Sequence, residues 1–107
     1  MVRILIHKQG EEVRLIHVSG HAQTRRLRGN EKDLICAAVS VTMENLLQGL
    51  SLIGHDKDAL IDEKDSSVRV IADSDPMEQL LARTAYETLK GIAEDHEEYV
   101  EMHEMEV

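Results

Sequence analysis

The sequence changes several times between two kinds of repeating pattern, and the order of these patterns constrains the fold more than any other feature. The segments VRILIH (residues 2–7) and VRLIHVS (residues 13–19) alternate apolar with polar side chains, which is the pattern of a half-buried strand. Between them, KQGEE is typical of a turn. Residues 2–7 and 12–19 are therefore predicted to form a β-hairpin.

A helical pattern replaces this alternation from Leu34 to Ile53, where apolar residues recur at spacings of three and four. Asp33 suits the N-cap of this helix, since its carboxylate can accept a hydrogen bond from an unpaired backbone N–H group. Gly54 suits the C-terminal stop. A first helix is therefore predicted between these two residues.

A second helix is predicted over DPMEQLLARTAYETLKGIA, residues 75–93. Asp75 suits its N-cap and Pro76 its first helical position, because proline lacks the N–H group that would be unpaired there. Glu78, three residues after the N-cap, completes a capping box.

Short strand patterns surround the second helix. DALID (residues 58–62) and SVRVIAD (residues 67–73) flank the turn EKDS and predict a second hairpin. The acidic tail EEYVEMHEMEV (residues 97–107) predicts a last strand with Val100 and Met102 on one face. The order ββαββαβ predicts a two-layer α+β fold, with two helices packed on one face of a mostly antiparallel sheet.

Length and charge limit the classes of function. The 107 residues favour one domain over residues 1–107, and 42% apolar residues exclude a disordered composition. A formal net charge of −9 opposes the phosphate backbone, which argues against general nucleic-acid binding and favours a basic partner. Simple solubility explains the same charge, so both interpretations stay open.

Two features indicate the compartment. Cys36 is the only cysteine and cannot form an intrachain disulfide, so a reducing compartment is expected. The N-terminal apolar run in MVRILIHKQG is interrupted by Arg3 and His7, and it is too short and too charged for a signal peptide or a membrane span. We therefore expect a soluble cytoplasmic protein with no membrane partner.

The stretch SGHAQTRRLRGNEKDLICAAVS (residues 19–40) carries the most suggestive chemistry, and its polar residues 20–32 predict a loop of the length that functional loops have. With Asp33 as the N-cap, Cys36 is the third residue of the first helix. There the helix dipole and the unpaired N–H groups favour a thiolate, the form that attacks a carbonyl. His21, at the end of a strand, can promote that thiolate and later protonate a leaving amine.

Simpler interpretations exist for the same residues. A lone cysteine near a helix start is commonly a small buried apolar residue, and a lone histidine at a strand end is commonly a surface residue. Ser40 is one turn beyond Cys36 on the same helix face, and Asp33 can orient His21 instead of capping the helix. Zinc bound by Cys36 and two histidines finds no supporting ligand spacing, so no metal or cofactor is expected.

The motif GHA (residues 20–22), followed by DLICAAVS (residues 33–40) at a helix start, resembles the ribosomal-processing cysteine protease family Prp. The resemblance extends to length, element order and acidity. It implies a homodimeric cytoplasmic endopeptidase that removes an N-terminal extension from large-subunit ribosomal protein twenty-seven. It further implies Cys36 as nucleophile, His21 as general base, and Gly20 as the glycine that lets the loop move. The motif also contains the companion residues Asp33 and Ser40.

The sequence departs from the expected family pattern in the loop. Lys32 directly precedes Asp33, and the nearest glycine is Gly29. The loop also holds three arginines, which can pair with the acidic tail, bind an acidic residue of a substrate, or simply be solvated: Arg25, Arg26 and Arg28. A different class of function stays open as the alternative, namely a non-catalytic homodimeric module that binds a ribosomal protein or an assembly intermediate.

Overall fold

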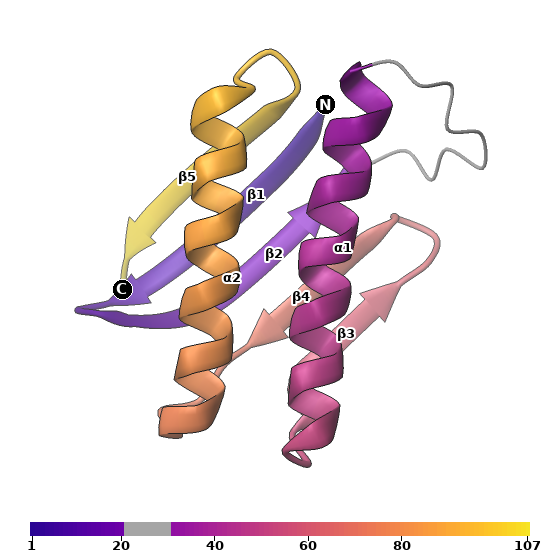
Figure 1. The fold of residues 1–107 in the computed structure, drawn as a ribbon. Helices are drawn as coiled ribbons and strands as arrows, with labels where there is room; N and C mark the ends of the chain where they lie inside the picture. The colour runs from indigo at the N-terminus through magenta and orange to yellow at the C-terminus, as the bar shows by residue number, and fades with distance from the viewer. Residues whose placement is uncertain (21–30) are drawn as a thin grey trace.

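The computed structural model of the chain describes residues 1–20 and 31–107 (Figure 1). The strands are β1 (Val2–Gln9), β2 (Glu12–Ser19), β3 (Ala59–Asp62), β4 (Ser67–Ile71) and β5 (Val100–Glu106). The helices are α1 (Glu31–Leu52), the short 3₁₀ turn η1 (Asp56–Asp58) and α2 (Pro76–Asp95). The predicted order ββαββαβ is confirmed.

The five strands form one sheet in the order β3-β4-β2-β1-β5, and both helices cover the same face of it (Figure 1). Three of the four pairings are antiparallel, and only β1 and β5 run parallel. The alternation in β1 explains its orientation, because Val2, Ile4 and Ile6 are buried under the helices while Arg3 is exposed. The predicted two-layer α+β fold is therefore confirmed.

The core between the two layers is built without phenylalanine or tryptophan. Aliphatic side chains from the sheet face meet a stripe on α1 made of Val39, Met43, Leu46 and Leu50, all of them buried. By length and composition alone, α1 is apolar enough to cross a membrane. In this fold, however, its apolar stripe packs against the sheet and against α2.

The start of α1 differs from the prediction. The helix begins at Glu31, so residues 31 and 32 are helical instead of part of the loop, and Asp33 lies inside the first turn instead of at the N-cap. Glutamate and lysine are good helix formers, and an acidic first turn suits the helix dipole. Cys36 is consequently the sixth helical residue and not the third. Its N–H group lies beyond the first four, which weakens the proposed effect of unpaired donors on the thiol.

The start of α2 was predicted in part. Asp75 caps the helix by accepting hydrogen bonds from the N–H groups of Met77 (2.9 Å) and Glu78 (3.1 Å), and Pro76 occupies the first position. The other half of the predicted capping box, a hydrogen bond from the Asp75 N–H to the Glu78 side chain, is wrong. The Asp75 N–H donates to the Asp73 carboxylate at 2.9 Å, whereas the Glu78 carboxylate accepts from the Asp73 N–H at 2.6 Å. The short side chain of Asp73 has taken the place expected for Glu78.

Candidate active site

The end of β2 is fixed by Gly20, the last described residue before the predicted loop. Its backbone φ is +76°, and a Cβ at this position would lie 2.6 Å from the carbonyl oxygen of Met1. An L side chain would thus meet both an unfavourable backbone conformation and a backbone clash. Glycine is required here by geometry, independently of any role in loop movement.

A series of contacts connects this point with the first turn of α1. After Met1, the Val2 N–H donates to the Tyr99 carbonyl (2.9 Å), and the Tyr99 N–H donates to the His96 carbonyl (3.0 Å). The Nδ1 of His96 in turn lies 3.5 Å from Oε1 of Glu31, at the start of α1. The chain therefore leaves β2 and enters α1 at the same end of the molecule, close to the N-terminus (Figure 1).

The motif residues on α1 lie just inside this end. Cys36 is 6% exposed and belongs to the hydrophobic core together with Ile35 and Val39. Asp33, one turn earlier, is also 6% exposed. As its spacing predicted, Ser40 follows Cys36 by one turn on the same helix face. Its side chain is half-buried. The helix thus aligns a carboxylate, a thiol and a hydroxyl along one inward-facing line.

Several predicted residues fall in residues 21–30, outside the described residues. These are His21, Gly29 and the three loop arginines, Arg25, Arg26 and Arg28. The pairing of His21 with Cys36 and the closure of the loop remain predictions. What the described residues establish is that His21 directly follows a strand end located at the same end of the molecule as the first turn of α1.

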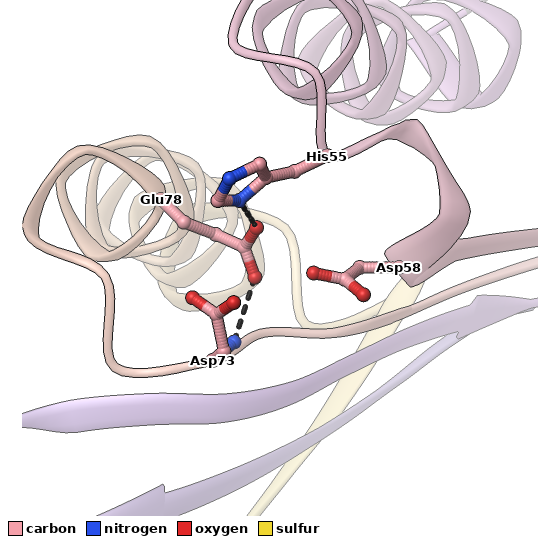
Figure 2. A group of neighbouring side chains, drawn as sticks. All are labelled: His55, Asp58, Asp73 and Glu78. Atoms are coloured by element: carbon pink, nitrogen blue, oxygen red, sulfur yellow. Dashed lines mark hydrogen bonds and ion pairs between the residues drawn. The ribbon is translucent and has the colours of Figure 1, made fainter.

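A second polar cluster, which sequence reasoning did not find, lies at the opposite end of the helices (Figure 2). We call it the Glu78 network; it consists of His55, Asp58, Asp73 and Glu78. The Glu78 side chain has no exposed surface, and its Oε1 lies 2.5 Å from Nδ1 of His55. Its Oε2 accepts the Asp73 N–H described above. Both carboxylate oxygens are therefore paired.

Burial and hydrogen bonding set the charges in the Glu78 network. Burial raises the pKa of Glu78, against the lowering effect of the hydrogen bonds from Asp73 and His55; the nearby Asp58 carboxyl raises it further. The hydrogen bond to Glu78 raises the pKa of His55, and this effect outweighs the desolvation of the imidazole. The hydrogen bonds with His55 and the Asp73 N–H compensate for the burial of this carboxyl group.

The Glu78 network also contains residue types that bind metals, one histidine and three carboxylates. One possible ligand atom from each of the four residues lies within 4.8 Å of the others. Two ligands of a tetrahedral zinc ion stand about 3.3 Å apart when each metal bond is near 2.0 Å. The 2.5 Å between His55 and Glu78 is a hydrogen-bond distance and leaves no room for an ion between these two atoms. The observed arrangement therefore fits a hydrogen-bonded junction better than a metal centre.

A sequence model of the family described as cysteine protease Prp matches residues 1–101 of the chain. A comparison with curated protein sequences found no match. Among solved structures, SMU.848 from Streptococcus mutans is 22% identical with a TM-score of 0.82, and the match covers 100% of this chain and 96% of that one.

Two structures of an essential ribosomal processing protease Prp from S. aureus also match the fold. One is a complex with a substrate peptide, at 19% identity, and the other carries a covalently linked product peptide, at 21% identity. Each has a TM-score of 0.77, and each match covers 98% of this chain and 100% of the other. At these identities the structural likeness establishes the fold.

Proposed function

Because this chain belongs to the cysteine protease Prp family, we propose that it is an endopeptidase that removes the N-terminal extension of large-subunit ribosomal protein twenty-seven. The observation that carries the proposal is the family match over residues 1–101, which includes both GHA and DLICAAVS. We further propose that the enzyme acts in the cytoplasm as a homodimer. Its substrate is then a basic protein, to which a net charge of −9 is complementary.

In the proposed reaction, His21 takes the thiol proton of Cys36, and the sulfur attacks the carbonyl carbon of the scissile peptide bond. The C–N bond then breaks as His21 gives that proton to the leaving amine, which departs as the new N-terminus. The extension remains attached to Cys36 as a thioester. A water molecule, deprotonated by His21, attacks this thioester and releases the extension as a carboxylic acid, while the sulfur regains its proton.

Three further residues have proposed supporting roles. Asp33 lies one turn before Cys36 and is buried, which suits a group that orients His21. Ser40 lies one turn after Cys36 and can line the site. Gly20 fixes where the strand ends, so it determines the point from which His21 starts.

The test is cleavage of ribosomal protein twenty-seven carrying its extension, followed by mass spectrometry of the products. Cys36→Ala should abolish cleavage without lowering the melting temperature substantially. His21→Ala should reduce kcat/KM by roughly 10²–10⁴, the usual contribution of general base catalysis. His17→Ala is the matched control, since this histidine lies in β2, four residues before His21 in the sequence, and the variant should cleave at nearly the normal rate.

A second candidate function is a non-catalytic homodimeric module that binds a ribosomal protein or an assembly intermediate. The 6% exposure of Cys36 favours it, because a nucleophile must be reached by its substrate. The same experiment separates the two functions. A Cys36→Ala variant that still cleaves at nearly the normal rate would rule out the thiol mechanism, and a folded chain that binds the substrate without cleaving it would establish the binding module.

A further inference from the structure

The two edges of the sheet differ in length and charge. The edge strand β3 has four residues, which gives a second polypeptide little to pair with. The other edge strand, β5, has seven residues, and no strand among residues 1–20 and 31–107 pairs with its outer side. Proteins commonly protect such an edge with lysines. The sequence of β5 is VEMHEME, whose charged residues are all glutamates apart from one histidine.

The backbone of β5 presents unpaired groups at regular intervals. The Val2 N–H donates to the Tyr99 carbonyl, and the Val107 N–H donates to the Lys8 carbonyl, so odd-numbered residues of this segment face β1. In a parallel ladder the alternate residues turn their N–H and C=O groups the other way. Met102 and Glu104 therefore offer backbone donors and acceptors to the open edge.

A groove of about 260 Å³ runs beside this edge, between β5 and α2. Its apolar lining comes from Ala93, Val100 and Met102. Its charged lining comes from Glu94, Glu97 and Glu104, with Lys90 as the one cation among the lining residues. The carboxylate of Glu104 is held in place by a hydrogen bond donated by the hydroxyl of Tyr86.

The residues that turn backbone groups to the open edge also turn their side chains toward the groove. Val100 and Met102 contact the core, and Glu104 reaches Tyr86 on α2. A strand added beside β5 would therefore direct every second side chain into the groove, where three carboxylates face it. This geometry selects an extended segment with lysine or arginine at alternate positions. A second copy of β5 would instead bring glutamates against glutamates.

We propose that the β5 edge and its groove form a docking site for an extended basic segment of the protein substrate, separate from the residues that carry the chemistry. This proposal rests on the proposed function, because it assigns to that substrate a second contact. The site is suitably located. Glu97 at one end of the groove is next to His96, which contacts Glu31 in the first turn of α1. A substrate held at Cys36 can thus continue past residues 96–99 onto β5.

The test uses a fluorescently labelled peptide of nine residues that alternates lysine with threonine, and measures its binding to the full chain by anisotropy at low salt. Replacing the three groove carboxylates in the triple variant Glu94→Gln, Glu97→Gln, Glu104→Gln should weaken binding about tenfold, since each exposed ion pair contributes only a small part of the affinity. The matched control neutralises three exposed carboxylates far from the groove, by Asp56→Asn, Glu63→Gln and Asp65→Asn. It should change the affinity by less than about twofold.

A second peptide tests strand addition directly. It has the same sequence but carries methyl groups on alternate backbone nitrogens, in two versions that cover both registers. The version whose methyl groups face β5 should lose binding, because it cannot donate to the edge, while the other version should bind as the parent does. Melting temperatures of all variants confirm that each is folded.

Three results would overturn the proposal: equal weakening in the groove and control variants, equal binding of both methylated peptides, or no binding of the parent peptide. Sedimentation of the free chain adds a fourth, since dissociation of a dimer by the groove substitutions would show that a second copy occupies the edge. No cleavage is measured here. A failure of this site therefore leaves the roles of Cys36 and His21 untouched, and a failure of those roles leaves the binding result standing.

Discussion

The two helices begin at opposite ends of the molecule, and their first turns differ in how polar groups are used (Figure 1). At the start of α2, Oδ1 of Asp75 accepts hydrogen bonds from two backbone N–H groups, and both carboxylate oxygens of Glu78 are paired, one with the Asp73 N–H and one with His55. At the start of α1, Asp33 and Cys36 are buried on the inward face of the helix. The first arrangement joins the ends of secondary-structure elements, and the second holds the residues for which we propose a catalytic role.

Under the proposed function, this difference is a division between stability, at the start of α2, and chemistry, at the start of α1. The Glu78 carboxylate, with both oxygens paired and no exposed surface, suits a structural role and cannot be reached by a substrate. The Cys36 thiol at the other end packs in the core as a small apolar group, and its reaction with a substrate is part of the proposed function. Substitutions at the α2 start should therefore reduce stability without altering the intrinsic activity, and substitutions around the α1 start should affect activity.

The largest expected effect on stability is that of Glu78→Ala. It leaves His55 and the Asp73 N–H without their partner, and we expect it to lower the free energy of unfolding by about 3 kcal/mol. Glu78→Gln keeps the size and one acceptor, so its loss should be smaller. Denaturant unfolding measures both, and Glu87→Ala, on the exposed side of the same helix, should change stability by less than about 0.5 kcal/mol. A loss of kcat/KM in folded Glu78→Gln protein would contradict the division.

A smaller effect is expected from Gly20→Ala, with Gly10→Ala as the matched control. Both glycines have positive φ, +76° and +60°, so each alanine incurs roughly 1–2 kcal/mol of backbone strain. Only at position 20 does the new Cβ also approach the Met1 carbonyl, whereas nothing lies within 4 Å of it at position 10. Gly20→Ala should therefore be the less stable variant and should also lose cleavage activity. Equal activity of the two variants would show that the strand end does not position His21.

The smallest expected effect is the pH dependence contributed by His55. Because its pKa is raised in the folded state, the pair with Glu78 stabilises fully below the unfolded pKa of about 6.5 and loses this contribution as pH rises through the folded pKa. The raised pKa of Glu78 acts in the same direction. His55→Gln keeps a hydrogen-bond donor but cannot titrate. The melting temperature of the wild type should exceed that of the variant more at about pH 6 than at about pH 9, and a constant difference would contradict a raised pKa of His55 in the folded state.

Much of the fold was predictable because strands and helices leave different periods in the sequence. The alternation of Val2, Ile4 and Ile6 predicted a strand with one buried face, and the spacing from Val39 to Leu50 predicted the stripe on α1. The pairing of β5 with β1 was not predicted, since a side-chain pattern reveals which face is buried but not which strand is adjacent. The start of α1 was misplaced by three residues, because Asp33 resembles a cap although Glu31 already opens the helix.

The candidate site was predictable only as far as local motifs reach. GHA and DLICAAVS are contiguous signals, and they led to Cys36 and the family that the comparison confirms. The Glu78 network left no such signal, since its residues come from the end of α1, the η1 turn, the exit of β4 and the start of α2. Glu78 was assigned to a capping box, and only the proximity of Asp73 and His55 shows its actual partners.

The parallel pairing of β1 with β5 has a consequence for how the chain folds. Val2 pairs with Val100, so this contact joins two residues that are 98 positions apart in the sequence (100 − 2). Closing so long a loop costs more chain entropy than forming either hairpin, and non-local pairing slows folding. We therefore expect β5 to dock last, onto a four-stranded intermediate whose β1 edge is still uncovered. The acidic sequence of β5 then serves a second purpose, because a late-docking strand with high negative charge resists pairing with other chains during that interval.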